Sequence, residues 1–257
     1  MMTNPLRSIR GSVVLVTGAA SGMGRATARL FGEEGAHVAV ADVNGQGAEA
    51  VADEIVAAGG SARGWALDVG DPASIGQVLG EVGAWHDRLD VVVNNAGISN
   101  WAPIDGDEYD EVWDRVMRVN ATGQQRVIHA ALSWLKQAPA GRIVNIASTE
   151  ALGATAGNSA YAASKAAVTG LTRALALELG KLGITVNCVC PGPIETGMTA
   201  RVPQADKETY AHRRTALRRY GQAEEVAHVT WSLCLPGASY ITGATIPVDG
   251  GLMARNA

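Results

Sequence analysis

Residues 12–35 read SVVLVTGAASGMGRATARLFGEEG, and this stretch carries a strand, a glycine turn and a helix in direct succession. The run from Val13 to Val16 is wholly apolar, which is typical of a strand buried on both faces of a parallel sheet. Glycines follow at positions 18, 22 and 24. The start of a helix presents free N–H groups and attracts phosphate. The stretch therefore predicts a strand–turn–helix unit that could hold a nucleotide, although tight turns also use glycine for structure alone.

The same alternation of strand and helix continues along the chain. Apolar strand-like runs occupy residues 12–19, 37–43, 62–69, 89–97, 141–148, 184–192 and 243–251. The segments between them are long enough for crossover helices. The pattern predicts an α/β fold with a doubly wound, mostly parallel, seven-stranded sheet and helices on both faces. We expect one domain over residues 1–257, with a substrate-covering segment at about 191–221.

One of these crossover segments shows a clear helical stripe. Its apolar or small residues recur every three or four positions: Val112, Val116, Val119, Gly123, Val127, Ala131 and Leu135.

Composition narrows the class of protein. The chain is 47% hydrophobic and 18% charged, which suits a substantial buried core, and its net charge of −4 argues against a nucleic-acid partner. No apolar run approaches the roughly 20 residues of a membrane span, and the N-terminal residues lack the apolar core of a signal peptide. Three cysteines favour a reducing compartment, so we expect a cytoplasmic protein. The five histidines show no metal-ligand spacing, and no metal site is predicted.

An acidic residue, Asp42, ends the second expected strand. It follows the glycine turn at about the distance of a carboxylate that binds an adenosine ribose. Such a carboxylate accepts hydrogen bonds from the ribose hydroxyls and repels a 2′-phosphate, and no Arg or Lys lies between Gly18 and Gly24. NAD is therefore favoured over NADP. The alternative is a carboxylate that caps the next helix.

Tyr161 and Lys165 lie four residues apart in SAYAASKAAVTGLTRALALEL, which begins at Ser159. That spacing puts both side chains on one face of a helix. An ammonium beside a phenol favours the phenolate and could lower the tyrosine pKa by about 1–3 units. The pair is a candidate acid–base device.

With these residues in view, the sequence resembles the short-chain dehydrogenase/reductase family. The resemblance covers nearly the whole chain and rests on motifs in the family's order: TGxxxGxG at 17–24, the acid at 42, DV at 68–69, NNAG at 94–97, Asn120, Ser148, YxxxK at 161–165 and PGPIET at 191–196. It implies a Rossmann fold and an oxidoreductase that carries hydride on a nicotinamide cofactor.

The resemblance also assigns roles to four catalytic residues. Tyr161 would be the general acid/base, Ser148 would hold the substrate oxygen, and Lys165 would bind the nicotinamide ribose. The side chain of Asn120 would hold a water for a proton relay. Each residue also has a purely structural interpretation, such as a turn cap for Ser148 or a helix bend for Asn120.

Further matches to the family place the cofactor. The residues implied to bind it are Gly18, Ser21, Gly22, Met23, Gly24, Asp42, Val43, Asp68, Val69, Asn95, Ala96, Gly97, Tyr161, Lys165, Pro191, Gly192, Ile194 and Thr196. Asn94 is assigned to structural support.

The substrate pocket is expected beside the catalytic residues. Its candidate residues are Trp101, Glu150, Leu152, Gly153 and Met198. A mainly apolar pocket with one polar end suggests a small-molecule secondary alcohol or its ketone. Glu150 either binds a second polar group of the substrate or faces solvent. The arginines at 213, 214, 218 and 219 could grip an anionic tail, but nearby acids favour a solvated, salt-bridged face.

Three functions are compared. The favoured one is an NAD-dependent secondary-alcohol dehydrogenase. The second is a 3-oxoacyl-thioester reductase of the same family, and the third is a non-catalytic NAD-binding regulatory protein. Helices expected around 107–137 and 158–182 look apolar on more than one face, and the family commonly assembles through them, so we expect a homotetramer with no membrane or nucleic-acid partner.

Overall fold

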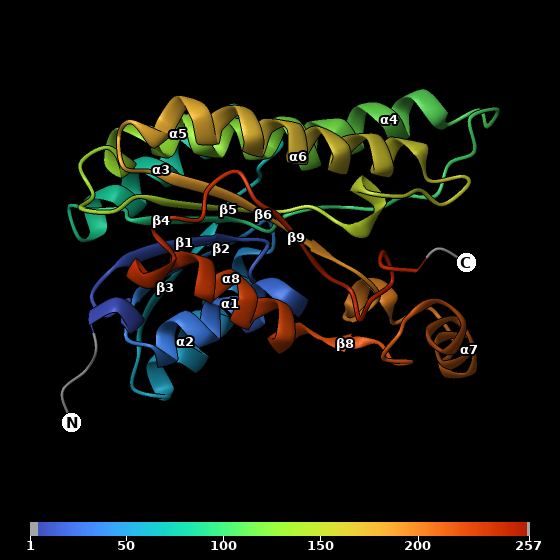
Figure 1. The fold of residues 1–257 in the computed structure, drawn as a ribbon. Coiled ribbons are helices and arrows are strands. Elements are labelled where there is room, and N and C mark those ends of the chain that lie inside the picture. The colour runs from blue at the N-terminus through green and yellow to red at the C-terminus, as the bar shows by residue number, and fades with distance from the viewer. Residues whose placement is uncertain (1–4, 256–257) are drawn as a thin grey trace.

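A computed structural model describes residues 5–255, and its centre is a seven-stranded sheet (Figure 1). The strands are β1 (Val13–Thr17), β2 (His37–Asp42), β3 (Ser61–Ala66), β4 (Val91–Asn94), β5 (Arg142–Ile146), β6 (Thr185–Pro191) and β9 (Thr245–Val248). Their order is β3-β2-β1-β4-β5-β6-β9, and every neighbouring pair is parallel. The predicted doubly wound α/β fold is confirmed. The order reverses between β1 and β4, which is where such sheets bind ligands.

Helices cover both faces of this sheet (Figure 1). One layer holds α1 (Gly22–Glu33), α2 (Gly45–Ala57) and α8 (Ala223–Cys234). The other layer holds α3 (Pro72–Trp85), α4 (Tyr109–Met117), α5 (Gln124–Leu135) and α6 (Ser159–Gly180). Alternate residues of β1 serve the two cores: Val14 and Val16 join one apolar cluster, whereas Val13 and Leu15 join the other. This double burial is why the strand sequence is continuously apolar.

The predicted helical stripe between residues 112 and 135 is real but interrupted. A π-helical turn, Arg118–Gly123, separates α4 from α5. Val112, Val127 and Leu135 are buried as the spacing predicted. The π turn places Asn120 inside the protein, and such turns are frequent at functional sites.

The segment expected to cover the substrate leaves the sheet after β6. It contains two short strands, β7 (Ile194–Glu195) and β8 (Gly221–Gln222), and the helix α7 (Gln204–Arg214). The short strands pair in parallel, Ile194 with Gly221 and Glu195 with Gln222. In Figure 1, α7 lies beyond one end of the main sheet, away from the two helical layers. Its role in covering a substrate stays a prediction.

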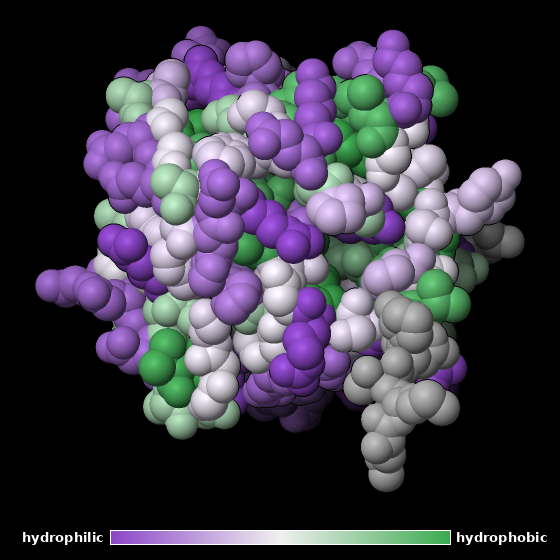
Figure 2. Space-filling view, turned by 90° about the vertical axis from the view of Figure 1, so that its left-hand side faces the viewer, coloured by the Kyte–Doolittle hydropathy of each residue, from purple (hydrophilic) through white to green (hydrophobic). Residues whose placement is uncertain are grey.

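Short 3₁₀ turns complete the chain at Pro5–Arg7, Thr149–Ala151, Gly197–Thr199 and Pro236–Ala238. The face at the end opposite α7 is largely hydrophilic, with only small, separate apolar areas (Figure 2). Among the described residues, no helix combines the length and apolar character needed to cross a membrane. The same residues contain no group of His, Cys, Asp or Glu arranged to hold a metal ion.

Candidate active site

The glycine turn between β1 and α1 is built from backbone contacts that leave no room for side chains. Gly18 has φ +64, and a Cβ added there would lie 2.7 Å from the Cα of Ala96 in the loop after β4. A Cβ on Gly24 would lie 2.1 Å from the carbonyl oxygen of Gly18. These two glycines therefore let α1 pack directly on the turn and let the turn pack on the neighbouring loop.

The N-terminus of α1 opens into a crevice of about 190 Å³. The N-cap residue, Ser21, makes no side-chain capping bond, so the first N–H groups of the helix keep their capacity for a ligand. The crevice is lined by Gly18, Ser21, Gly22, Met23, Asp42, Asn95, Ala96, Gly97, Thr196, Gly197 and Met198. Nine of the predicted cofactor residues are in this lining, and uncapped N–H groups beside a carboxylate suit a dinucleotide's phosphate and ribose.

Asp42 lies at the end of β2 and faces the glycine turn. One carboxylate oxygen accepts the N–H of Ala20 at 3.0 Å, and the other accepts the N–H of Asn44 at 2.9 Å. The cap of α2 is Asn44, whose side chain accepts the N–H of Gly47. The alternative interpretation of Asp42 as a helix cap is therefore wrong, and its carboxylate is held at the edge of the crevice.

Asn95 lines the crevice, but its side chain braces the turn. Its Nδ2 donates to the carbonyl oxygens of Thr17 and Gly18, both at 3.0 Å. Thr17 Oγ1 in turn accepts the N–H groups of Asn95 and Ala96. The sequence analysis gave Thr17 no role beyond its place in the TGxxxGxG motif, although a polar residue at the end of an apolar strand was the available signal. Asn94 has the expected structural role, because its Nδ2 donates to Asn145 Oδ1 at 2.9 Å.

The other predicted cofactor residues lie outside the crevice lining. Val43 and Asp68 are exposed beyond the ends of β2 and β3, while Val69 is buried. Ile194 belongs to the apolar core, and Gly192 packs against Asp249. Their contact with a cofactor stays a prediction, as does that of Pro191.

Ser148, Tyr161 and Lys165 come together at the ends of β5 and α6. The Ser148 side chain lies close enough to the Tyr161 hydroxyl to lower its pKa. Lys165 is buried, with Nζ 5.6 Å from the centre of the Tyr161 ring, and it donates to the carbonyl oxygen of Ile146 at 2.9 Å. A Cβ on Gly97, which lines the crevice, would lie 3.2 Å from Lys165 Nζ. The predicted catalytic group thus adjoins the predicted cofactor crevice.

The pKa values of this group differ from the sequence-based expectation. Burial raises the pKa of Tyr161 to about 12, and the nearby Ser148 side chain offsets only part of that effect. Burial lowers the pKa of Lys165 to about 8. The expected lowering of the phenol pKa by the ammonium is wrong for the protein alone, because burial is the largest effect on Tyr161 and Lys165 is not among the groups that lower its pKa.

The side chain of Asn120 is hydrogen-bonded to the loop after β4. Its Oδ1 accepts the N–H of Ile98 at 2.8 Å, and its Nδ2 donates to Ile98 O and to Ser164 Oγ. Both amide protons are therefore used. Asn120 thus ties the loop that carries Gly97 to α6, and because Oδ1 can still accept a second hydrogen bond, its role in holding a water stays a prediction.

Of the predicted substrate residues, Met198 lines the crevice, and the contact of all five with a substrate stays a prediction. Trp101 is 68% exposed and its ring lies against Gly157. Leu152 and Met198 are also exposed apolar side chains. The Glu150 carboxylate accepts two hydrogen bonds from Thr155, through its N–H and its hydroxyl. Glu150 therefore does not simply face solvent, and its contact with a polar group of the substrate stays a prediction.

Three neighbours of the predicted site residues were missed by sequence reasoning. Met253, near the C-terminus, lies 3.4 Å from a Cβ placed on Gly153. Tyr210 of α7 is close enough to Glu150 and Arg214 to feel both charges, although burial is the main cause that raises its pKa. Cys190 on β6 accepts a hydrogen bond from the Ser148 backbone. Only tertiary folding brings these distant segments together, so no local signal marks them.

A parallel sheet with a phosphate-binding turn beside a Ser–Tyr–Lys group defines a dinucleotide-dependent oxidoreductase. Residues 18–253 match a family model described as enoyl-(acyl carrier protein) reductase. The chain belongs to the short-chain dehydrogenase/reductase family, and it is an oxidoreductase that uses a nicotinamide cofactor.

Individual relatives cover almost all of the chain. A 3-oxoacyl-[acyl-carrier-protein] reductase of Thermotoga maritima is 40% identical over 95% of this chain and 99% of its own length. A meso-2,3-butanediol dehydrogenase of Serratia marcescens is 39% identical over 95% of both chains. A short-chain type dehydrogenase/reductase from Mycobacterium marinum superposes with a TM-score of 0.91 at 34% identity, covering 97% of this chain and 98% of that one.

Proposed function

We propose that this protein interconverts a small secondary alcohol and its ketone with NAD(H), and that Tyr161 is the general acid/base. The observation that carries the proposal is the meeting of the Ser148 and Tyr161 hydroxyls beside buried Lys165, at a crevice edged by Asp42. A bound nicotinamide supplies or accepts the hydride. The other roles belong to this chain's own residues.

Proton transfer follows from the state of the phenol. A pKa of about 12 keeps Tyr161 protonated at neutral pH, which is the form that donates to a carbonyl oxygen during reduction. Ser148 lies beside it and would hold the same oxygen through its hydroxyl. Oxidation of an alcohol requires the reverse transfer, from the substrate hydroxyl to the Tyr161 oxygen.

Asp42 supports NAD rather than NADP. Its carboxylate accepts hydrogen bonds from two backbone N–H groups. Asp42 also lines the crevice, at the position that we assign to the adenosine ribose. A 2′-phosphate at this position would meet a like charge, whereas the free hydroxyls of NAD could donate to it. Near-equal use of NADH and NADPH would contradict this assignment.

A second candidate is the reduction of a 3-oxoacyl thioester. It is supported by the similarity to the Thermotoga maritima reductase. The arginines at 213, 214, 218 and 219 also support this second candidate. Among the described residues, Arg219 is the only one of these four that forms an ion pair, with Glu225. The charges of the other three could therefore bind an anionic carrier. The expected salt-bridged face is thus only partly formed.

One assay separates these candidates. Wild-type protein would be tested with acetoin and with acetoacetyl-CoA, each with NADH and with NADPH. Preference for acetoin and NADH supports the first function, and preference for acetoacetyl-CoA supports the second. Binding of NADH without turnover of any ketone or alcohol would instead support the regulatory alternative.

Replacement of Tyr161 by Phe tests the catalytic assignment. We expect kcat to fall at least about 100-fold, because general acid catalysis of this kind contributes roughly 10²–10⁴-fold. The affinity for NADH, followed by its fluorescence, should stay within about twofold of wild type. A Tyr161→Phe variant that keeps most of its activity would remove Tyr161 from the mechanism.

A further inference from the structure

The substrate-covering segment contains an ion pair whose lysine is buried and whose glutamate is partly exposed. Lys207 in α7 donates to Glu195 in β7 at 2.5 Å, and Lys207 is only 7% exposed. Helix α7 is otherwise strongly polar, and Ala211 is its one other buried residue. Burying an ammonium is costly unless a partner compensates it, so this lysine is committed to Glu195.

An aromatic ring completes the surroundings of Lys207. Its Nζ lies 5.6 Å from the centre of the Tyr220 ring, immediately before β8. Since β8 pairs with β7, Lys207 contacts both ends of the segment that leaves and rejoins the sheet. The Lys207 ammonium therefore connects α7 to the paired strands β7 and β8, where the segment leaves and rejoins the main sheet.

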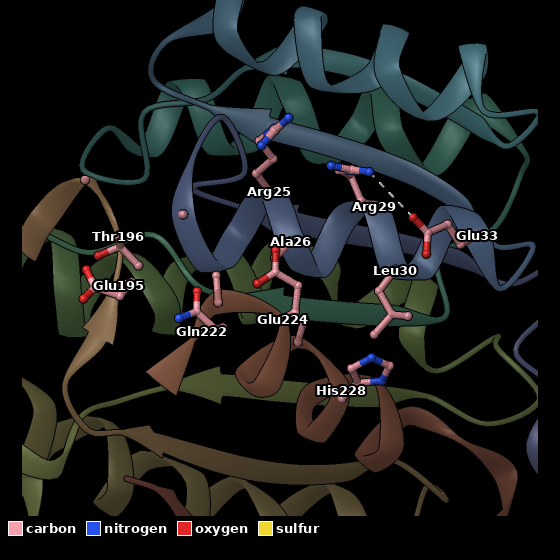
Figure 3. A pocket seen from close by; sticks show the side chains of 14 residues that line it. Arg25, Ala26, Arg29, Leu30, Glu33, Glu195, Thr196, Gln222, Glu224 and His228 are labelled. Atoms are coloured by element: carbon pink, nitrogen blue, oxygen red, sulfur yellow. Dashed lines mark ion pairs between the residues drawn. The ribbon is translucent and has the colours of Figure 1, made fainter. Parts of the chain in front are cut away.

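Glu195 also precedes the residue that closes the cofactor crevice. The Thr196 side chain lies 3.3 Å from the position of a Cβ on Gly22, at the start of α1. Thr196 and Gly22 line the crevice and also line a larger groove of about 380 Å³ between α1 and α8. Figure 3 shows Glu195 and Thr196 side by side at one end of that groove, across from Arg25 on α1.

Cavities lie on two sides of Glu195. Glu195 lines the 380 Å³ groove and also a cavity of about 230 Å³ beneath α7, which Lys207 and Tyr220 share. Ile194 is anchored in the apolar core, whereas Glu195, the other residue of β7, lies between the two cavities. The local hydrogen bonds from Thr199 Oγ1 to Ile194 O and Thr196 O shape the turn but do not reach α7.

We propose that Lys207 and Glu195 are positioning residues for the reaction, because their ion pair couples the placement of α7 to the placement of Thr196. This inference rests on the proposed function. Substrate enclosure by α7 and cofactor retention at Thr196 then depend on one contact. Neither Lys207 nor Glu195 touches the reacting atoms.

The test uses Lys207→Met, which keeps the length of the side chain under Tyr220 and removes its charge. We expect the Kd for NADH to rise about tenfold, equivalent to about 1.4 kcal/mol, with a similar rise in KM for the ketone and a smaller change in kcat. Lys207→Arg should restore most of the affinity, since it returns the charge. Amide exchange should accelerate in both residues 194–199 and residues 204–214.

A double-mutant comparison separates coupling from general damage. The double variant Glu195→Gln with Lys207→Met should resemble Lys207→Met, because the ion pair is already lost in the single variant. Glu195→Gln alone should raise the Kd for NADH at least as much, because it leaves the buried ammonium without its counter-charge. The matched control is Glu54→Gln, which removes the exposed Arg25–Glu54 ion pair of 2.8 Å and should leave the Kd for NADH unchanged.

The outcomes distinguish the inference from the function beneath it. A lower melting temperature with an unchanged Kd for NADH, or additive effects of the two single changes, would overturn the coupling and leave the proposed function intact. Failure of the wild-type protein to bind NADH or NADPH would contradict the proposed function. In that event, faster amide exchange confined to α7 would also overturn the coupling, whereas faster exchange in both segments would support it.

Discussion

The buried charge of Lys165, which we assign to the catalytic group, lowers the stability of the folded protein. Its ammonium is buried, donates to Ile146 O, and has a pKa lowered to about 8 by that burial. Ile146 O also accepts a hydrogen bond from Gln124 Nε2 at 3.3 Å, so the carbonyl is satisfied without the lysine. The charge is therefore held at a net cost that the fold itself does not require.

Replacement of Lys165 by Met should stabilise the protein and abolish most of its activity. From a pKa lowered from 10.5 to about 8, the charged lysine costs on the order of 3 kcal/mol at neutral pH. We expect a higher urea midpoint for Lys165→Met at pH 7, measured by tryptophan fluorescence. A lower midpoint would mean that the lysine stabilises the fold.

The same variant predicts a pH dependence of defined sign. Between about pH 8 and pH 10.5 the unfolded lysine binds a proton that the folded one has released, so wild-type stability gains as pH rises. The advantage of Lys165→Met should be full below pH 8 and should shrink as pH approaches 10.5. A constant difference across this window would rule out burial of the charge as the cause.

At the scale of elements, the unit formed by β1, its turn and α1 has close backbone contacts that require glycine. A side chain at Gly24 would overlap the Gly18 carbonyl and the Asn95 amide, at 2.1 and 2.5 Å. Backbone and a bonded amide cannot move aside without opening the crossing of strand and helix. Glycine is thus required here for packing, while α1 needs no flexibility at that position.

Gly24→Ala should destabilise the protein by about 1–3 kcal/mol, the usual cost of overpacking, and should weaken NADH binding because α1 shifts. Gly80→Ala is the matched control, since a Cβ there meets nothing within 4 Å on an exposed face of α3. That variant should gain up to about 1 kcal/mol of stability. Thermal unfolding of both variants tests the contrast, and similar losses in the two would contradict it.

The larger elements could be predicted from sequence, whereas the short ones could not. Seven apolar runs became seven strands: β1, β4, β5 and β6 are buried along their whole length and β2 nearly so, whereas the edge strands β3 and β9 are only partly buried. The two-residue strands β7 and β8 carry no periodic signal, and they form because Ile194 meets Gly221. The π turn at Asn120 was equally invisible, since an inserted residue leaves the apolar spacing nearly intact.

At the scale of the whole molecule, one helix face lacks a partner. Leu177 of α6 is 86% exposed, and Tyr240, in the segment before β9, is fully exposed. Large apolar side chains left in water favour association, and we propose that α4, α5 and α6 join copies of this chain into a homotetramer.

Leu177→Lys should therefore shift the assembly to smaller species in sedimentation experiments, because it places a charge within the proposed interface. Val56→Lys is the control, as Val56 is an exposed residue of α2 in the opposite helical layer. It should leave the assembly unchanged. Equal behaviour of the two variants would exclude the α6 face.

The amino-acid sequence alone determined the sheet, the glycine turn, the acid at Asp42 and the pairing of Tyr161 with Lys165. All of these depend on short-range patterns: burial sets the composition of a strand, and helix geometry sets which residues share a face. Only the tertiary structure decided the protonation of Tyr161, the engagement of Glu150 and Asn120, and the contact between Lys207 and Glu195. Those properties depend on how much water is excluded and on which distant groups meet, and neither quantity is encoded by spacing along the chain.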